Sequence, residues 1–136
     1  MPPEVFAGAV SRLETVWFGR ETKVTAGQLE SLSRTLISQA EAGEPKLKEL
    51  WVLSGDLSSV SPEVLVGIIQ RLEHVGIWGM MTEDQVIKIL LMLKRKQQGR
   101  LKQLEIRHPE VYSDPVSLSL LLEAKMNNAV RIYVSI

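Results

Sequence analysis

Apolar residues recur along the chain in two alternating patterns. In the first, they stand three or four positions apart, which is typical of a helix with one buried face. This spacing occurs in four stretches: Leu29, Leu32, Leu36; Val64, Leu65, Ile68, Ile69; Val86, Leu90, Leu93; and Val116, Leu120, Leu121. The second is a triplet of the form L-x-x-L-x-L, interpreted as a short strand: Leu13, Val16, Phe18; Leu47, Leu50, Val52; Leu72, Val75, Ile77; Leu101, Leu104, Ile106; and Ala129, Ile132, Val134. Helices are therefore predicted to alternate with short strands, and residues 3–10 form a further helix-like stretch.

Residues typical of helix ends flank these stretches. Thr25 and Thr82 each precede a glutamine by three positions, which is the spacing of a capping box. Ser61 and Asp114 each stand before a proline, so a cap residue precedes a proline at the first helical position. Glycines stand where two helices are expected to end: Gly43 and Gly99.

The chain contains an internal repeat. Residues 2–18, PPEVFAGAVSRLETVWF, align without a gap with residues 61–77, SPEVLVGIIQRLEHVGI, at an offset of 59. Each long unit contains two triplets, and the five triplets begin at positions 13, 47, 72, 101 and 129. The successive steps are therefore 34, 25, 29 and 28 residues. The long first step indicates an insertion, which we place in residues 40–45, AEAGEP.

This order of elements predicts an α/β fold. Short strands alternating with helices imply parallel strands joined by right-handed crossovers. Five strands are too few for a closed eight-stranded barrel. A doubly wound sheet is the other alternative, but the glycine-rich phosphate loop typical of that fold is absent. Similar units favour stacking in one direction with all helices on one side. We therefore expect residues 1–136 to form a single domain, a right-handed β/α solenoid with a parallel sheet of about five short strands.

The triplet at Leu72, Val75 and Ile77, with its four counterparts, resembles the strand signature of leucine-rich repeats, whose units have 20–29 residues. Units of this length with full helices are similar to the ribonuclease-inhibitor class, which also forms the sensing domains of NOD-like receptors. The resemblance covers nearly the whole chain. It implies a horseshoe segment with strands on the concave side and helices on the convex side. It also implies a protein-binding role in an intracellular receptor or adaptor, as in innate immunity.

The turns after the strands depart from that family. Leucine-rich repeats place Asn or Cys three residues after the triplet, where the side chain satisfies backbone groups of the turn. Here these positions hold Glu21, Gly55, Met80 and Pro109. The turn backbone must then find other partners or water. We expect irregular, shallower turns.

The residues between the triplet positions predict a binding surface. Side chains alternate along a strand, so residues between inward-pointing ones line the open, concave face. One row across this face would hold Trp17, Trp51, Gly76, Glu105 and Tyr133, and the next Gly19, Leu53, Trp78, Arg107 and Ser135. Clustered apolar side chains on a surface tend to mark contact sites, and Trp and Arg are favoured there. The candidate partner-binding residues are Trp17, Trp51, Leu53, Trp78, Glu105, Arg107 and Tyr133. The alternative is that the rings pack on one another and only cover the sheet.

Composition narrows the function further. Sixteen basic residues balance sixteen acidic ones, so no broad attraction to nucleic acid or to an anionic membrane is expected. The absence of cysteine excludes disulfides and thiolate zinc sites, and it favours a cytoplasmic location. No apolar run reaches the ~18–20 residues that span a bilayer. Only His74 and His108 offer imidazole bases. We therefore expect no enzymatic activity, no cofactor and no metal site.

The C-terminal strand, residues 131–136, is expected to form an uncovered edge. Open edges invite pairing with another chain. Either the sequence is a segment of a longer repeat array, which we favour, or it forms a homo-oligomer through this edge. Two functions follow: a recognition module for a protein partner, or a structural, capping or self-associating segment with no dedicated ligand.

Overall fold

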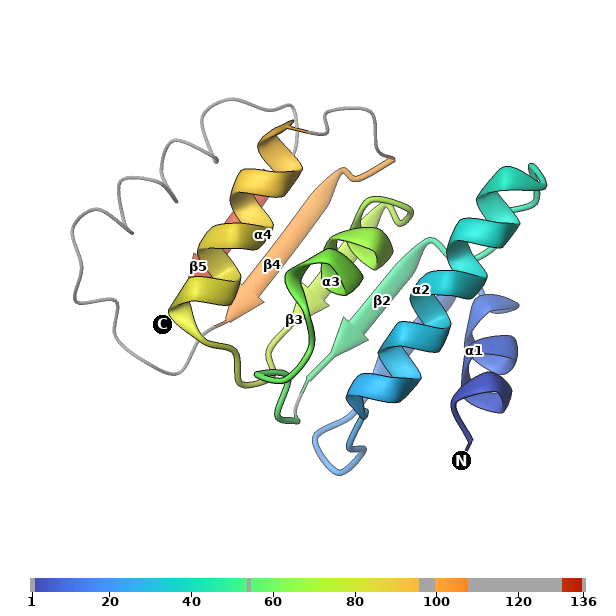
Figure 1. The fold of residues 1–136 in the computed structure, drawn as a ribbon, viewed down its shortest axis with the longest axis horizontal. Coiled ribbons are helices and arrows are strands. Elements are labelled where there is room, and N and C mark those ends of the chain that lie inside the picture. Colours follow the sequence, from blue (N-terminus) through green and yellow to red (C-terminus); the bar gives the residue numbers. More distant parts are fainter. Residues whose placement is uncertain (1, 54, 96–99, 108–130, 136) are drawn as a thin grey trace.

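A computed structural model describes residues 2–53, 55–95, 100–107 and 131–135. Helices and strands alternate within these residues, as the apolar pattern predicts (Figure 1). The elements in chain order are α1 (Pro3–Ser11), β1 (Thr15–Phe18), α2 (Ala26–Glu41), β2 (Glu49–Val52), α3 (Pro62–Ile69), β3 (His74–Ile77), α4 (Glu83–Arg95), β4 (Gln103–Arg107) and β5 (Arg131–Ser135). Asp114, Pro115, Gly99 and Pro109, for which caps or turns were predicted, lie outside the described residues.

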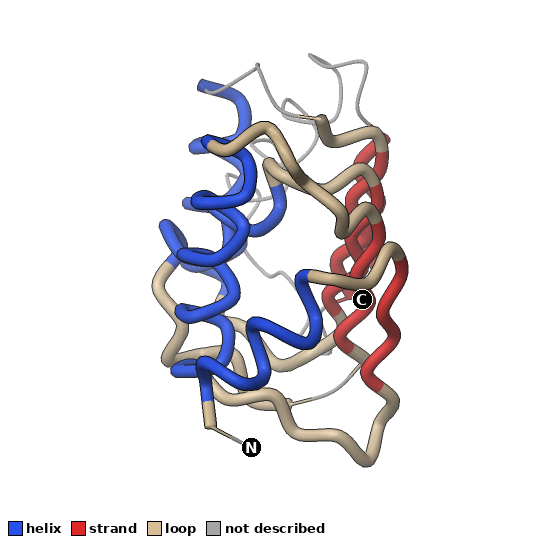
Figure 2. The backbone as a smooth tube through the Cα atoms, turned by 90° about the vertical axis from the view of Figure 1, so that its right-hand side faces the viewer, coloured by secondary structure: helices blue, strands red, loops and turns tan. Residues whose placement is uncertain are grey.

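The five strands form one parallel sheet in the order β1-β2-β3-β4-β5, so each strand pairs with the next one along the chain. The four described helices form a second layer on one face of this sheet (Figure 2). The predicted α/β class with a parallel sheet of five short strands is confirmed. The arrangement leaves the other face of the sheet without a described helix, and we call it the open face.

The strands pair in the register that the triplets predict. One row of paired residues across the open face contains Trp17, Trp51, Gly76, Glu105 and Tyr133. A repeated backbone contact sets this register at the start of each strand. The Glu14 carbonyl accepts from the amides of Lys48 and Glu49 at 2.8 and 3.0 Å. The carbonyls of Lys48 and Glu73 accept from the next repeat in the same way, at the same two distances.

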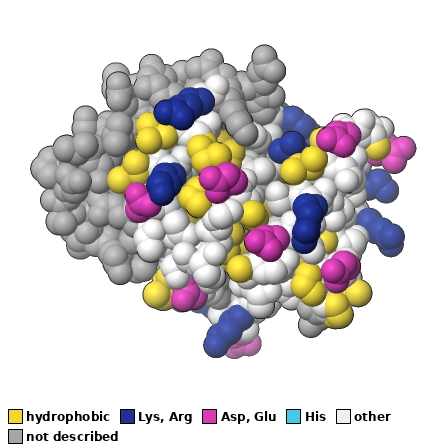
Figure 3. Space-filling model, in the orientation of Figure 1, with side chains coloured by type: hydrophobic (Ala, Val, Ile, Leu, Met, Phe, Trp, Pro, Cys, Tyr) yellow, Lys and Arg dark blue, Asp and Glu magenta, His cyan; other side chains and the backbone are white. Residues whose placement is uncertain are grey.

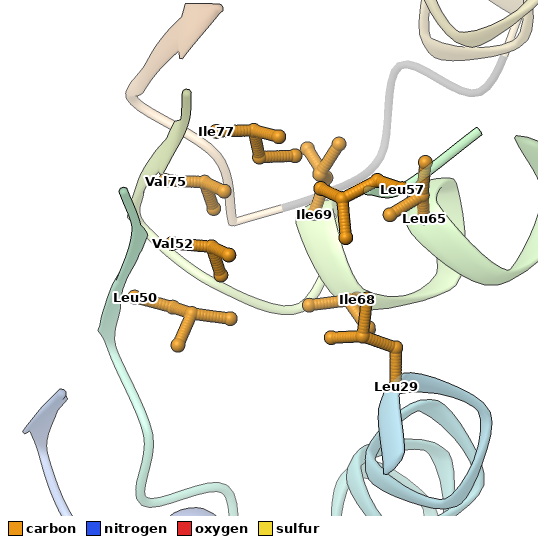
Figure 4. A pocket seen from close by; sticks show the side chains of 9 residues that line it. All are labelled: Leu29, Leu50, Val52, Leu57, Leu65, Ile68, Ile69, Val75 and Ile77. Atoms are coloured by element: carbon orange, nitrogen blue, oxygen red, sulfur yellow. The ribbon is translucent and has the colours of Figure 1, made fainter. Parts of the chain in front are cut away.

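The triplet side chains of β2, β3 and β4 point from the sheet toward the helices and form the core. Leu47, Leu50, Leu72, Val75 and Leu104 are each at most 2 % exposed. Figure 4 shows the meeting of the layers, where side chains of β2 and β3 face those of α2, α3 and the segment before α3 across a small gap. Its lining is entirely aliphatic: Leu29, Leu50, Val52, Leu57, Leu65, Ile68, Ile69, Val75 and Ile77. The gap therefore belongs to the core and offers a ligand no polar group.

Leu13 departs from the predicted inward position, because its side chain is 51 % exposed. It lies in the turn after α1, where its amide donates to the Val10 carbonyl at 3.1 Å. The equivalent Leu47 and Leu72 each follow an earlier strand of the sheet, whereas β1 is the first. Leu13 consequently has no earlier repeat beside it in the described structure. The Ala129 position lies outside the described residues.

The extra residues of the first repeat are mostly helical, which corrects their predicted place in residues 40–45. The steps of 34, 25 and 29 residues follow the lengths of the intervening helices, which are 16, 8 and 13 residues. A helix can gain turns while its two ends stay attached to neighbouring strands. Variation in repeat length is therefore taken up mainly in the helical layer.

The predicted capping residues perform their roles. In both capping boxes the threonine hydroxyl accepts from the glutamine amide, and the glutamine side chain accepts from the threonine amide: Thr25 with Gln28, and Thr82 with Gln85. The Ser61 hydroxyl accepts from the amide of Val64. Gly43, with a φ of 74°, follows α2. Two backbone bonds, from Gly43 to Ala40 and from Glu44 to Gln39, complete a Schellman motif there.

The turns between β2 and α4 take their hydrogen bonds from backbone groups and from the side chain of Gln85. The Met80 amide donates to the Gly55 carbonyl, and the Met80 carbonyl accepts from Leu57, both at 2.8 Å. Gln85, 6 % exposed, donates through Nε2 to the carbonyls of Leu57 and Val60 at 2.9 and 2.7 Å. One buried side chain thus caps its own helix and satisfies two carbonyls of the preceding repeat, as buried backbone groups require.

Candidate interaction surface

The three tryptophans of the chain meet on the open face, and we call them the tryptophan cluster: Trp17, Trp51 and Trp78. The rings of Trp17 and Trp51 stack, with centroids 4.7 Å apart and planes 12° from parallel. Trp78 sets its ring at 90° to that of Trp51, with centroids 6.2 Å apart. The predicted continuous aromatic patch with Trp17 at its edge is therefore confirmed.

Gly76 and Glu49 fix the position of the central ring. The Trp51 ring lies directly over Gly76 on the next strand, because a Cβ built at Gly76 would come within 1.9 Å of Trp51 Cε3. Trp51 Nε1 donates to Glu49 Oε1 at 2.7 Å, along the same strand and on the same face. The Trp51 ring is thus fixed by its stack on Trp17 and by its hydrogen bond to Glu49. The absence of a side chain at Gly76 leaves the space in which the ring lies.

Exposure differs across the cluster. Trp17 is 56 % exposed, whereas Trp51 and Trp78 are half-buried, as is Leu53. The rings cover the sheet and pack on one another, which supports a covering role for the cluster. A large apolar area of Trp17 nevertheless faces outward, which supports a binding role. The outward area is available for contact without any rearrangement of the fold.

The remaining candidate residues lie toward the other end of the sheet. Glu105 is half-buried and pairs with Gly76 on one side and Tyr133 on the other. Arg107 pairs with Ser135, in the predicted register. The backbone of Tyr133 lies in the same row as Glu105, and the backbone of Arg107 lies in the row of Ser135. The sheet thus divides the candidates into an apolar group on and beside β1–β3 and a polar group on β4 and β5.

Two residues important for the cluster were not among the sequence candidates. Glu49 and Gly76 were passed over, although Gly76 was placed in the correct row. A signal for both was present, because Glu49 stands two positions before Trp51 and therefore on its face of the strand. A glycine opposite a tryptophan on the neighbouring strand also indicates a ring lying across the sheet.

Charged residues of alternating sign line the end of the sheet where the strands begin. Glu14, Lys48, Glu73 and Lys102 occupy equivalent positions, as their shared backbone contacts show. Lys102 Nζ lies 3.0 Å from Glu73 Oε1. The hydrogen bond from Lys102, more than the nearby positive charges, holds the pKa of Glu73 below its ordinary value. Glu73 and Lys102 thus form an ion pair at this end of the sheet.

His74 is half-buried on β3 and pairs in register with Glu49 and Gln103. Within residues 2–53, 55–95, 100–107 and 131–135, no three His, Asp or Glu side chains are grouped to hold a metal ion.

The helical face shows acidic and basic side chains interspersed where it is coloured (Figure 3). No helix in the described part of the chain is long and apolar enough to cross a membrane.

Comparison of the chain with protein-family models, with curated proteins and with solved structures found no match.

Proposed function

We propose that the chain is a leucine-rich-repeat solenoid segment that binds a partner protein through the open face of its sheet. The succession of parallel strands, the single helical layer and the recurring burial of the triplet leucines support the solenoid. The lack of cysteine supports a place within an intracellular receptor or adaptor. The chain acts in this proposal as a recognition module without catalysis.

The outward ring of Trp17 is the observation that carries the binding role. A tryptophan 56 % exposed, stacked on a second ring and beside a third, presents a rigid apolar surface. Such a surface loses little conformational freedom on binding, since Trp51 already holds the ring from one side. Interface energy concentrates at anchors of this kind, with Trp among the most frequent.

A two-step binding experiment tests the role of the tryptophan cluster. The wild-type chain first captures a protein from extract, and the captured protein is then purified. Its affinity is measured by calorimetry against the wild type, Trp17→Ala and Met80→Ala. Trp17→Ala is expected to weaken binding by about tenfold or more, as hot-spot truncations of about 2 kcal/mol do.

Met80→Ala is the matched control, because Met80 is 57 % exposed and lies in the turn after β3. It should retain wild-type affinity. Equal affinity for all three proteins would refute a recognition role for the cluster. That result would favour the alternative, a structural segment whose rings only cover the sheet. The half-buried position of Trp51, over Gly76 and against Trp17, is the observation that supports this alternative.

A further inference from the structure

Most of the large apolar side chains that are exposed in the described structure lie at its β1 end. Four large apolar side chains are exposed in the described residues: Val5 (55 %), Leu13 (51 %), Trp17 (56 %) and Met80 (57 %). The first three belong to α1, to the turn that follows it and to β1. They therefore gather at one end of the sheet, whose edge strand is β1.

The internal repeat shows what this end lacks. Leu13 is equivalent to Leu47 and Leu72, since each stands three positions before a residue of the paired core row: Val16, Leu50 and Val75. Leu47 and Leu72 are 1 % and 0 % exposed, whereas Leu13 is 51 % exposed. Leu47 and Leu72 each follow an earlier strand of the sheet, whereas no described strand precedes Leu13. Leu13 is thus exposed at the position where a neighbouring strand helps to bury its two equivalents.

Trp17 shows the same one-sided environment. One face of its ring stacks on Trp51 of the following strand. Trp51, in the same row one strand further on, lies between Trp17 and the backbone of Gly76 and is half-buried. A side chain from a strand beyond β1 would cover Trp17 as Trp17 covers Trp51.

We propose that the β1 edge receives the β5 edge of a second copy, so that the two sheets continue as one parallel sheet. Among the described strands β5 is the opposite edge of the sheet, and it runs parallel to β1. In the continued register Arg131 of one copy pairs with Thr15 of the next. The chain has no net charge, so copies do not repel one another. A head-to-tail contact of this kind does not close on itself and builds open chains.

Cysteine cross-linking tests the register of this contact. The chain has no cysteine, so Thr15→Cys with Arg131→Cys introduces the only two thiols. Within one copy these positions are four strands apart, about 19 Å, which no disulfide spans. Between copies they would be about 5 Å apart, a separation that a disulfide bridges. Mild oxidation should give a ladder of dimers, trimers and longer species in denaturing gels.

Three cross-linking outcomes oppose the proposal. Absence of a ladder would refute it. Dimer from Thr15→Cys alone, at the yield of the double variant, would show β1 meeting β1 instead. A ladder that survives Leu13→Glu would show that the contact does not involve the exposed leucine.

Sedimentation velocity supplies an independent measurement on the chain without cysteines. The weight-average mass of the wild type should at least double between dilute and concentrated samples, and Leu13→Glu should stay monomeric. Met80→Glu, which places the same charge at an equally exposed site, should behave as the wild type. A wild-type chain that is monomeric at every concentration would overturn the inference, whatever the open face binds. Should Leu13→Glu fail to fold by circular dichroism, the cross-linking result decides.

Discussion

Replacing Gly76 with alanine is expected to displace the ring of Trp51. A Cβ at position 76 would lie 1.9, 2.3 and 2.7 Å from three atoms of that ring: Cε3, Cζ3 and Cδ2. Carbon atoms in contact prefer separations of about 3.5–4.0 Å. The ring must therefore move outward by roughly 1.5–2 Å. The movement separates it from Trp17, from Trp78 and from the Glu49 carboxylate that accepts its Nε1 hydrogen bond.

The cost follows from those contacts. Each aromatic pair contributes about 0.5–1.5 kcal/mol beyond its buried area. The hydrogen bond to Glu49 contributes a further ~0.5–1.5 kcal/mol. Alanine offsets part of this loss, since glycine in a strand is destabilising by roughly 0.5–1 kcal/mol. We expect Gly76→Ala to lower the free energy of unfolding by about 1–3 kcal/mol, in the range found for other overpacked sites.

Urea unfolding followed by far-ultraviolet circular dichroism measures this change, and the near-ultraviolet spectrum reports the coupled tryptophans. Gly8→Ala is the matched control, because a Cβ at Gly8 meets nothing within 4 Å and the residue lies in α1. It should leave stability equal or raise it by up to ~1 kcal/mol. If Gly76→Ala unfolds at the wild-type urea concentration with an unchanged near-ultraviolet spectrum, the ring does not lie over Gly76 and the reasoning fails.

Three further predictions concern the turns and the charged row. Gln85→Ala should destabilise the fold by about 2–4 kcal/mol and Gln28→Ala by only ~1 kcal/mol, because both lose a capping box but the first also loses the two buried hydrogen bonds from Gln85 to the carbonyls of Leu57 and Val60; equal losses in urea titrations would contradict this. Gly43→Ala should cost about 1–2 kcal/mol, since position 43 has a positive φ, and a thermal midpoint at or above that of the wild type would disprove it. Because the pKa of Glu73 is lowered on folding, its contribution is present above the ordinary pKa and is lost as pH falls through the folded value. Glu73→Gln should therefore flatten the acid limb of the stability profile, and 1 M salt should reduce the difference; parallel profiles would exclude the interaction.

Periodicity and repetition predicted the arrangement of the sheet. The triplet spacing placed Trp17, Trp51 and Gly76 in one row because strand geometry allows a single register once the core positions are known. The capping boxes were readable because their hydrogen bonds join residues three positions apart. Features set by neighbours within the chain were thus accessible from the sequence.

Features that depend on residues far apart in the chain could not be predicted from the sequence. Position 13 holds leucine, as the buried positions 47 and 72 do. Only the place of β1 at the edge of the sheet shows that the Leu13 side chain is exposed. Gln85 looked like an ordinary capping residue, because its bonds to Leu57 and Val60 cross 28 and 25 positions. The insertion in the first repeat was recognised from the sequence but misplaced, since a longer helix and a longer loop give the same step between triplets.

The link between repeat length and helix length has an evolutionary consequence. Insertions that lengthen a helix leave the strand register intact, since that register is set by the shared carbonyl bonds of Glu14, Lys48 and Glu73. Substitutions on the open face, in turn, alter neither the helices nor the core row. The scaffold can therefore lengthen or shorten its helices on one side and vary exposed side chains such as Trp17 on the other, and neither change disturbs the core row.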